Sequence, residues 1–231
     1  MRGVNLLKET DTPFGILSVV TDFSLDYAKE IFNFFYENDL TDVSFNSEEK
    51  EGANQSSSLE SDDSEKRYKN FLEQFWQCVK TSDKKFYVRE FAFILDAILY
   101  QSPDIGKSLT NQPMGILTFD SEGNFSSYSP ELLTIKDTKY ENFILGNVFE
   151  NSFDEVLRSE KFERISRDIQ AGFDLCEQEC EYFFRCGGGT PVAKLEENGD
   201  FASKETMYCR LKYQIPTDIV LNDFEAVIAA R

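Results

Sequence analysis

The sequence contains no histidine, and it has only 24 Lys and Arg compared with 42 Asp and Glu, which gives a formal net charge of -18 at pH 7. The missing imidazole excludes the Ser-His-Asp triad, the Cys-His pair and every zinc site that uses histidine ligands. The shortage of basic side chains argues against a nucleic-acid partner, because phosphate contacts depend on clustered Lys and Arg. Any metal is therefore expected on sulfur or carboxylate ligands.

Long hydrophobic runs and a targeting segment are also missing. No stretch approaches the roughly 20 apolar residues of a membrane span, and the first residues lack the basic, apolar and small-residue order of a secretory signal. We predict a cytoplasmic protein with no membrane partner. In such a reducing compartment, clustered cysteines point to metal or redox chemistry and not to structural disulfides.

The segment 2–46 predicts a βαβ unit that follows the end of a helix. "GILSVVT" (15–21) and "TDVSFN" (41–46) have the length and apolar content of buried strands. The intervening "SLDYAKEIFNFFYEND" has apolar residues at helical spacing, with Ser24 as its expected N-cap. One such unit cannot cover both faces of its sheet, so the pattern favours the tail of a larger α/β domain. A small α+β domain completed by later strands is the alternative.

The segment 47–66 is acidic and serine-rich, and it predicts a loop or a disordered connection. Loops at the carboxyl ends of parallel strands commonly bind ligands. The side chains nearest this strand end are therefore candidates for substrate contact, with solvated charge as the alternative: Asn46, Glu48, Glu49 and Asn54.

Helices and a hairpin are predicted next. "RYKNFLEQFWQCVK" and "FYVREFAFILDAILYQ" carry aromatic stripes at helical spacing, and Cys78 is expected as a buried small hydrophobe on the first of them. "MGILTF" and "FSSYS" flank the turn "DSEGN", which predicts a β-hairpin. Ser152 and Glu155 form a capping box at the start of a helix whose buried side is marked by Leu157 and two isoleucines, and Gly172 is expected to end it.

Four cysteines follow with the spacing C-x3-C-x5-C-x22-C: Cys176, Cys180, Cys186 and Cys209. Four thiolates from two separated segments suit a tetrahedral zinc ion or a cubane iron-sulfur cluster. The three glycines after Cys186 would let backbone N–H groups approach sulfur, which helps to set an iron-sulfur potential. Glycine-rich turns also occur in zinc knuckles, so the spacing leaves zinc, an iron-sulfur cluster and unligated thiols open.

The whole cysteine block, "CEQECEYFFRCGGGTPVAKLEENGDFASKETMYCRL", resembles the SPASM region of radical SAM peptide maturases. So do the preceding "FDSEGNFSSYSPELL" and "NFILGNVFENSFDEVLRSEKF", and the likeness is strongest to the cyclophane-forming maturases that accompany glycine-rich repeat peptides. "GILSVVTDFSLDYAKEIFNFF" and "VSFNSEEKEGAN" resemble the last strands and helices of the partial TIM-type barrel of that family. The implied fold is α/β plus α+β: a C-terminal barrel fragment, then a SPASM-like cysteine-rich domain with a β-hairpin.

The sequence departs from the family pattern in two places. Thr190 stands where a further cysteine is expected, and Ser129 and the stretch after Gly146 offer no thiol, so the ligands of a first auxiliary cluster are missing together. The four remaining cysteines match those of the second auxiliary [4Fe-4S] cluster. Nothing in the 231 residues matches the C-x3-C-x2-C loop that holds the cluster on which S-adenosylmethionine is cleaved. We therefore expect this chain alone to be inactive in radical chemistry.

The leading hypothesis is the C-terminal portion of a radical SAM/SPASM maturase that cross-links a ribosomally made precursor peptide. It would arise by truncation, a split gene or a misplaced start codon, and a separate chain could carry the N-terminal radical SAM half. The expected domains are residues 1–63 (barrel remnant and acidic loop), 64–110 (linking helices) and 111–231 (auxiliary-cluster domain). S-adenosylmethionine and its cluster are expected only in a full-length enzyme. The alternative is a non-catalytic four-cysteine zinc module that binds a peptide or protein partner.

Overall fold

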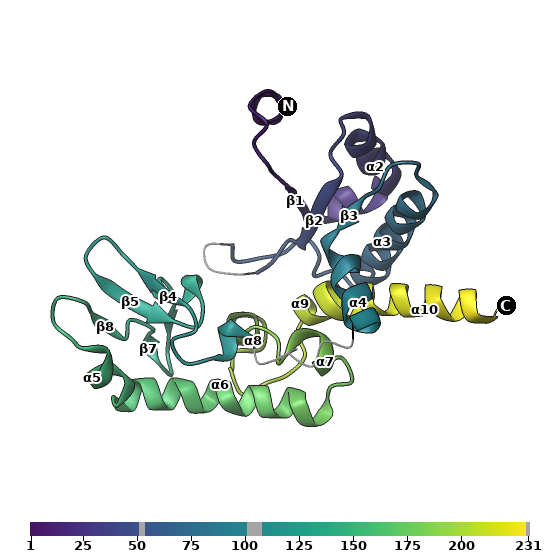
Figure 1. Cartoon of the computed structure of the whole chain (residues 1–231). Helices are drawn as coiled ribbons and strands as arrows, with labels where there is room; N and C mark the ends of the chain where they lie inside the picture. Colours follow the sequence, from purple (N-terminus) through teal and green to yellow (C-terminus); the bar gives the residue numbers. More distant parts are fainter. Residues whose placement is uncertain (51–53, 101–107, 230–231) are drawn as a thin grey trace. The chain divides into compact units, whose positions relative to one another are not determined.

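The computed structural model describes residues 1–50, 54–100 and 108–229 (Figure 1). Contacts within the chain divide it into two compact units. The first consists of Met1–Glu48, Ser58–Gln101 and Gln214–Arg231, and the second of Glu49–Ser57 and Ser102–Tyr213. No helix among the described residues is long and apolar enough to cross a bilayer.

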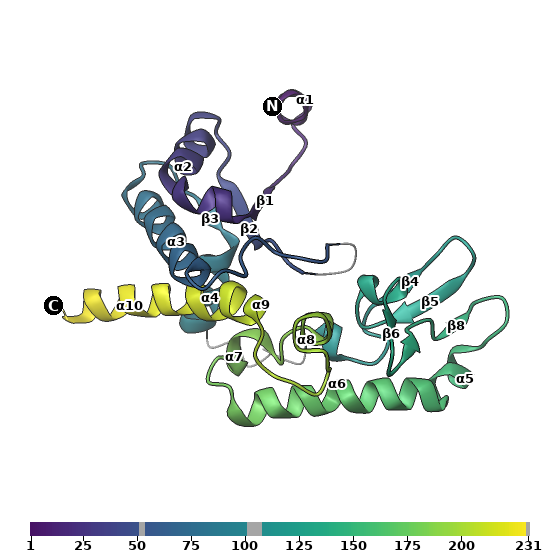
Figure 2. The same ribbon diagram turned by 180° about the vertical axis from the view of Figure 1, so that it is seen from behind.

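The first unit is built on a three-stranded parallel sheet in the order β1-β2-β3. Its strands are β1 (Ile16–Val20), β2 (Asp42–Ser47) and β3 (Tyr87–Val88). The helices of this unit, visible from two sides in Figures 1 and 2, are α1 (Arg2–Glu9), the 3-10 turn η1 (Asp22–Asp26), α2 (Ala28–Glu37), α3 (Ser64–Thr81), α4 (Arg89–Tyr100) and α10 (Ile215–Ala229). The parallel pairing of β1 with β2 around α2 confirms the predicted βαβ unit.

Aromatic side chains form the core between this sheet and α3. The ring of Phe45 on β2 lies 4.9 Å from the ring of Phe75 and 5.5 Å from that of Phe71, both in edge-on geometry. All three rings are fully buried. The aromatic stripe predicted for α3 is therefore its core face. Edge-on aromatic pairs at these distances also stabilise the packing beyond the effect of their buried area.

Three local predictions for this unit are wrong. The helix α2 begins at Ala28 and not after Ser24, because Ser24 belongs to η1, where its hydroxyl accepts a hydrogen bond from the backbone N–H of Thr21 at 2.8 Å. A strand, β3, precedes α4, and it is too short to leave a periodic signal in the sequence. Cys78 is partly exposed and not buried.

The predicted acidic connection is only partly a loop. Leu59 is 1% exposed and Ser57 is 7% exposed, so this stretch buries side chains that composition alone placed in solvent. The helix α3 already begins at Ser64, whose side chain is fully buried. Residues 51–53 of the connection lie outside the described residues.

The second unit combines small antiparallel sheets with helices. The strands β4 (Leu117–Phe119), β5 (Asn124–Ser127) and β8 (Gly146–Asn147) form one sheet, and β6 (Lys136–Asp137) pairs with β7 (Glu141–Asn142). The β4–β5 pairing confirms the hairpin, whose turn places Gly123 at φ 85°. Its helical elements are η2 (Leu109–Asn111), η3 (Pro130–Leu133), α5 (Phe153–Leu157), α6 (Glu160–Glu179), α7 (Phe183–Cys186), α8 (Pro191–Asn198), α9 (Met207–Cys209) and a π-helical turn, Arg210–Gln214.

The long helix α6 runs along the second unit. The strands lie beside its first half, and α7 and α8 lie beside its second half (Figures 1 and 2). A buried hydrophobic cluster of the unit lies along it: Tyr128, Leu132, Tyr140, Phe143, Phe162, Ile165, Ile169, Val192, Leu195 and Phe201. Packing on α6 thus connects the segment that follows the hairpin to α8.

The capping box at Ser152 is confirmed, since its hydroxyl accepts from the N–H of Glu155 and the Glu155 carboxylate accepts from the N–H of Ser152. The helix it starts is the short α5, and Leu157 on it is 38% exposed and not buried. Gly172 does not end a helix, because α6 continues to Glu179. A Cβ at position 172 would lie 2.0 Å from the carbonyl oxygen of Phe201, so this glycine permits close packing in mid-helix.

Candidate metal centre

Two of the four cysteines lie at the end of α6. Cys176 is in the last turn and is 4% exposed. Cys180 is the C-cap residue, and its backbone N–H donates to the carbonyl oxygen of Cys176 at 3.0 Å. The three-residue gap therefore places the two cysteines about one helical turn apart at the end of α6.

The third cysteine, Cys186, ends the one-turn helix α7 and is followed by three glycines in left-handed conformations, with φ values of 58°, 99° and 70°. A side chain at such positions is strained, so the turn depends on glycine. Burial raises the pKa of the Cys186 thiol, while hydrogen bonds from the N–H groups of Gly188 and Gly189 act in the opposite direction. The turn thus aims two backbone donors at one sulfur.

The fourth cysteine, Cys209, arrives from a separate segment at the end of α9. Thr206 caps this helix, and its hydroxyl accepts a hydrogen bond from the N–H of Cys209 at 3.0 Å. The Glu197 carboxylate accepts from the N–H groups of Met207 and Tyr208. Burial raises the pKa of Cys209 to about 11, with the Thr206 hydroxyl working against it. Without a metal the thiol stays protonated at neutral pH, and ligation would release that proton.

The structure brings the four predicted cysteines to one region of the second unit. Charge on Cys176 or Cys180 raises the pKa of Cys186, and charge on Cys186 or Cys176 raises the pKa of Cys209, so Cys186 lies near the first two cysteines and Cys209 lies near Cys186 and Cys176. A Cβ at Gly189 would lie 3.4 Å from the Cys209 sulfur, which joins the glycine turn to the distant segment. All five cysteines of the chain are free thiols. Among the described residues, no three Cys, Asp or Glu side chains form a group tight enough for a single metal ion.

Two polar side chains that contact the cysteine site were not predicted from the sequence. Asn111 in η2 is 1% exposed, and its amide donates to the carbonyl oxygen of Gly189 at 2.6 Å. Lys194 in α8 is 2% exposed, and its ammonium lies 3.3 Å from the Cys176 sulfur. The sequence did hold a signal for Lys194, because it stands within "PVAKL", an apolar run that indicates burial on all sides.

The donor set fits an iron-sulfur cluster. Four sulfur atoms are available from Cys176, Cys180, Cys186 and Cys209. The N–H groups of Gly188 and Gly189 donate to the Cys186 sulfur, and the backbone of Gly189 passes close to the Cys209 sulfur. Such clusters are held by four thiolates and tuned by hydrogen bonds to sulfur.

The candidates for substrate contact have hydrogen-bond partners, each within its own unit. The side-chain oxygen of Asn46 accepts from Arg89 at 2.8 Å, and the Glu48 carboxylate accepts from the backbone N–H of Ser58 at 2.6 Å. The Asn54 amide donates to the carbonyl oxygen of Glu49 at 2.6 Å. Their role towards a substrate stays a prediction.

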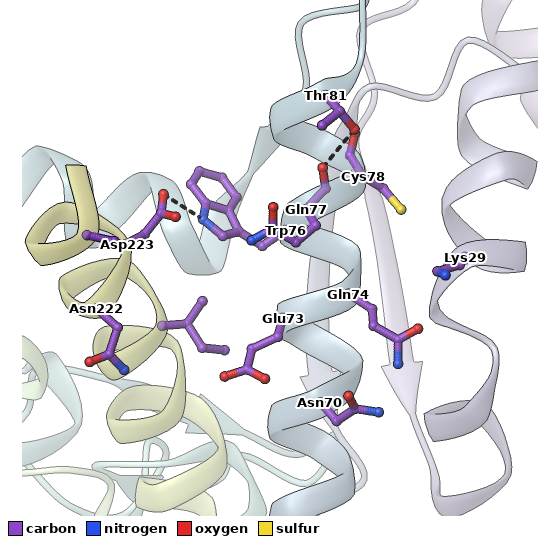
Figure 3. Close-up of a pocket in the computed structure, with 12 residues that line it drawn as sticks. Lys29, Asn70, Glu73, Gln74, Trp76, Gln77, Cys78, Thr81, Asn222 and Asp223 are labelled. Carbon is purple, nitrogen blue, oxygen red and sulfur yellow. Dashed lines mark hydrogen bonds between the residues drawn. The ribbon is translucent and has the colours of Figure 1, made fainter. Parts of the chain in front are cut away.

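A groove of about 620 Å³ in the first unit is lined by α2, α3 and α10 (Figure 3). The Trp76 indole N–H donates to Asp223 at 3.4 Å, and Lys80 forms an ion pair with the same carboxylate. Cys78 projects from the side of α3 that faces Lys29, as Figure 3 shows. The groove contains a single thiol, and it is not part of the cysteine site.

Comparison with known proteins bears directly on this site. Residues 112–181 match the SPASM family, described as an iron-sulfur cluster-binding domain, and the matched segment includes Cys176 and Cys180. A serine-type anaerobic sulfatase-maturating enzyme of Bacteroides thetaiotaomicron is 24% identical over 93% of this chain and 53% of its own length. These matches relate residues 112–181 to iron-sulfur cluster-binding domains, and they make the chain similar to part of a sulfatase-maturating enzyme.

Two further relatives extend the comparison. The Synechocystis protein named "Uncharacterized protein sll1766" is 42% identical over 97% of this chain and 56% of its own length. The solved structure "Native anSMEcpe with bound AdoMet" shares the fold over 98% of this chain and 59% of its own, with a TM-score of 0.65 at 18% identity. The chain thus spans about half the length of the curated relatives that it matches.

Proposed function

We propose that these 231 residues form the auxiliary-cluster-binding part of a radical SAM/SPASM maturase that cross-links a ribosomally made peptide. In this proposal Cys176, Cys180, Cys186 and Cys209 hold one auxiliary [4Fe-4S] cluster, and the surrounding unit helps to seat the peptide. The cluster, when bound, would supply a centre that takes up or releases one electron.

The main observation behind the proposal is that two segments far apart in the sequence, one with Cys186 and one with Cys209, lie close together in the structure. The glycine turn after Cys186 has two N–H groups directed at that thiol and passes beside the Cys209 sulfur. Three successive residues with positive φ are all glycine, the residue that adopts this conformation without steric strain, and the turn so formed can direct N–H groups at a ligating sulfur. The match of residues 112–181 to an iron-sulfur cluster-binding domain supports the same metal chemistry.

The peptide substrate is proposed from the relatives. One curated relative is named as a sulfatase-maturating enzyme, and the structure "Native anSMEcpe with bound AdoMet and Cp18Cys peptide" shares the fold over 98% of this chain and 60% of its own, with a TM-score of 0.61 at 18% identity. We propose that a precursor peptide approaches the carboxyl end of β2, near Asn46, Glu48, Glu49 and Asn54. Carbon-carbon cross-linking of the cyclophane type is the reaction proposed for it.

The radical-generating part is proposed to lie outside these 231 residues, in the same polypeptide or in a separate chain. The parallel sheet of the first unit supports a place in a partial barrel, because its edge strand β1 exposes Leu17 and Val19 at 59% each. Parallel sheets are normally covered on both faces, so these apolar side chains favour further strands or helices packed on them.

Iron, acid-labile sulfide and zinc analysis after anaerobic purification and reconstitution tests the cluster. About four iron and four sulfide per chain would support the proposal, because a [4Fe-4S] cluster contains these numbers. One zinc without sulfide would overturn it in favour of a four-cysteine zinc module that binds a peptide or protein. The variant C78S is the matched control, since Cys78 lies in the first unit and should not change the metal content.

A further inference from the structure

Lys194 is a buried cation at the cysteine site. Its side chain is 2% exposed, and its ammonium donates to the carbonyl oxygen of Gly172 at 2.7 Å and to the Cys176 sulfur at 3.3 Å. Its Cε atom lies 3.8 Å from the position that a Cβ at Gly189 would occupy. The lysine therefore contacts α6 at Gly172 and Cys176, and its side chain also lies near Gly189 of the glycine turn.

Burying an ammonium group in this way is costly unless an acceptor or a negative charge compensates it. The two acceptors of Lys194 are a neutral carbonyl oxygen and a cysteine sulfur. Of these two, only the sulfur can become an anion. The position of the lysine is thus explained if the sulfur carries negative charge in the working protein, as a ligating thiolate does.

We propose that Lys194 is a positioning residue for the auxiliary cluster: its ammonium holds the Cys176 ligand and raises the reduction potential of the bound cluster. This inference rests on the proposed function, because it requires an iron-sulfur cluster on the four cysteines. Reduction adds negative charge to the cluster and its sulfur ligands, and a fixed positive charge beside one ligand stabilises the reduced form more than the oxidised form.

The N–H groups of Gly188 and Gly189 act on a different ligand, Cys186. The cluster would therefore be influenced at two ligands: by the full positive charge of Lys194 at Cys176, and by the backbone N–H dipoles at Cys186. In the reduction itself, dithionite supplies one electron to the cluster, and no bond to Lys194 is made or broken.

A redox titration monitored by EPR, on the reconstituted full chain, tests this role. The variants are K194M, which removes the charge but keeps the chain length, and K194R, which keeps the charge. The matched control is K161M, because the Lys161 ammonium also donates to a backbone carbonyl, that of Ile144 at 2.9 Å, and to the side chain of Asn142. We expect K194M to favour the oxidised form about tenfold, which corresponds to a midpoint potential about 59 mV lower for a one-electron step. K194R and K161M should stay near the wild type.

A second measurement does not depend on a variant that keeps its cluster. In the wild-type chain grown with ¹⁵N-lysine, pulsed EPR of the reduced cluster should show a lysine nitrogen coupling, and K194R should lack it. Absence of that coupling in the wild type, or a K194M potential equal to the wild type, would overturn the role of Lys194 while leaving the cluster in place. A wild-type chain without iron and sulfide would overturn the proposed function, and this inference with it.

Discussion

The side-chain amide of Asn111 fixes the carbonyl oxygen of Gly189 through a hydrogen bond of 2.6 Å. The two residues are 78 positions apart in the sequence. The same amide also reaches the carbonyl oxygen of Gly187 at 3.4 Å. The conformation of the glycine turn, and with it the direction of the N–H groups that face Cys186, therefore depends on a side chain from a different part of the unit.

Removing this amide should loosen the metal site. The variant N111A leaves the buried carbonyl oxygen of Gly189 without this donor, and loss of such a bond typically costs about 1–3 kcal/mol of stability. We expect faster release of iron to a chelator from the reconstituted protein, measured by absorbance of the iron-chelator complex. The control is N147A, which removes a similar bond, of 2.9 Å, to the carbonyl oxygen of Glu122 in the hairpin. Equal release rates for the two variants would show that Asn111 has no special part in the site.

Alanine at the glycine turn should be more costly than alanine at an ordinary left-handed glycine. At Gly188, φ is 99° and a Cβ would lie 2.6 Å from a ring carbon of Phe173, whereas Gly199 has φ 75° and nothing within 4 Å. G199A should cost about 1–2 kcal/mol of unfolding free energy from conformation alone. G188A adds a steric clash and should cost about 2–5 kcal/mol. Urea unfolding of both variants measures the difference, and a G188A no worse than G199A would contradict the packing.

Gly172 offers a test of close approach in mid-helix. Replacing glycine by alanine in a helix usually adds about 1 kcal/mol of stability, but here the new Cβ would meet the carbonyl oxygen of Phe201. We expect G172A to lower the free energy of unfolding by about 1–3 kcal/mol. The same change at Gly3 in α1, where nothing lies within 4 Å, should not destabilise the protein. Thermal unfolding followed by circular dichroism would reveal whether the two substitutions have opposite signs.

Asp168 should make the stability of the second unit depend on acid. It accepts a hydrogen bond from Tyr140 at 2.6 Å and pairs with Lys139 at 2.8 Å. Burial acts to raise the pKa of Asp168, but the bonds from Lys139 and Tyr140 outweigh it and hold the pKa below its ordinary value. The stabilisation is therefore present above the unfolded pKa of about 3.9 and is lost as the pH falls through the lower folded value. Urea unfolding between pH 7 and pH 3 should show a smaller acid loss in D168N than in the wild type.

Tyr140 should make the stability of the second unit depend on pH in the alkaline range. Burial, followed by the hydrogen bond to Asp168, raises its pKa to about 12. Because the folded pKa is the higher one, the stabilisation is complete below the unfolded value of about 10 and is lost as the pH rises through the folded value. Stability should fall between pH 10 and pH 12 more steeply in the wild type than in Y140F. Parallel pH curves for the two proteins would mean that the phenol does not titrate in this environment.

Local patterns in the sequence predicted much of this structure. The βαβ unit, the hairpin with Gly123 and the capping box at Ser152 each depend on residues close together in the chain, and each is confirmed. The ending of a helix at Gly172 was wrongly predicted, because the role of this glycine depends on Phe201, which lies far along the sequence. Propensity arguments cannot detect such a contact.

In the candidate site, too, some residues were predicted from local sequence patterns and others were not. The spacing of the four cysteines and the glycines after Cys186 pointed to one sulfur-lined site, and the structure brings these residues into one region. Asn111 and Lys194 were missed because polar side chains are expected on the surface unless a long-range partner buries them. For these residues the partners are the carbonyl oxygens of Gly189 and Gly172 and the Cys176 sulfur.

Single replacement of each cysteine by serine, followed by iron and sulfide analysis of the reconstituted protein, tests the central claim most directly. The account predicts that C176S, C180S, C186S and C209S each lose most of their iron and sulfide, while C78S keeps the wild-type content. Because four thiolates hold one cluster, no one of them should be dispensable. Full iron and sulfide in any one of the four variants with an unchanged EPR spectrum, or their loss in C78S, would contradict it.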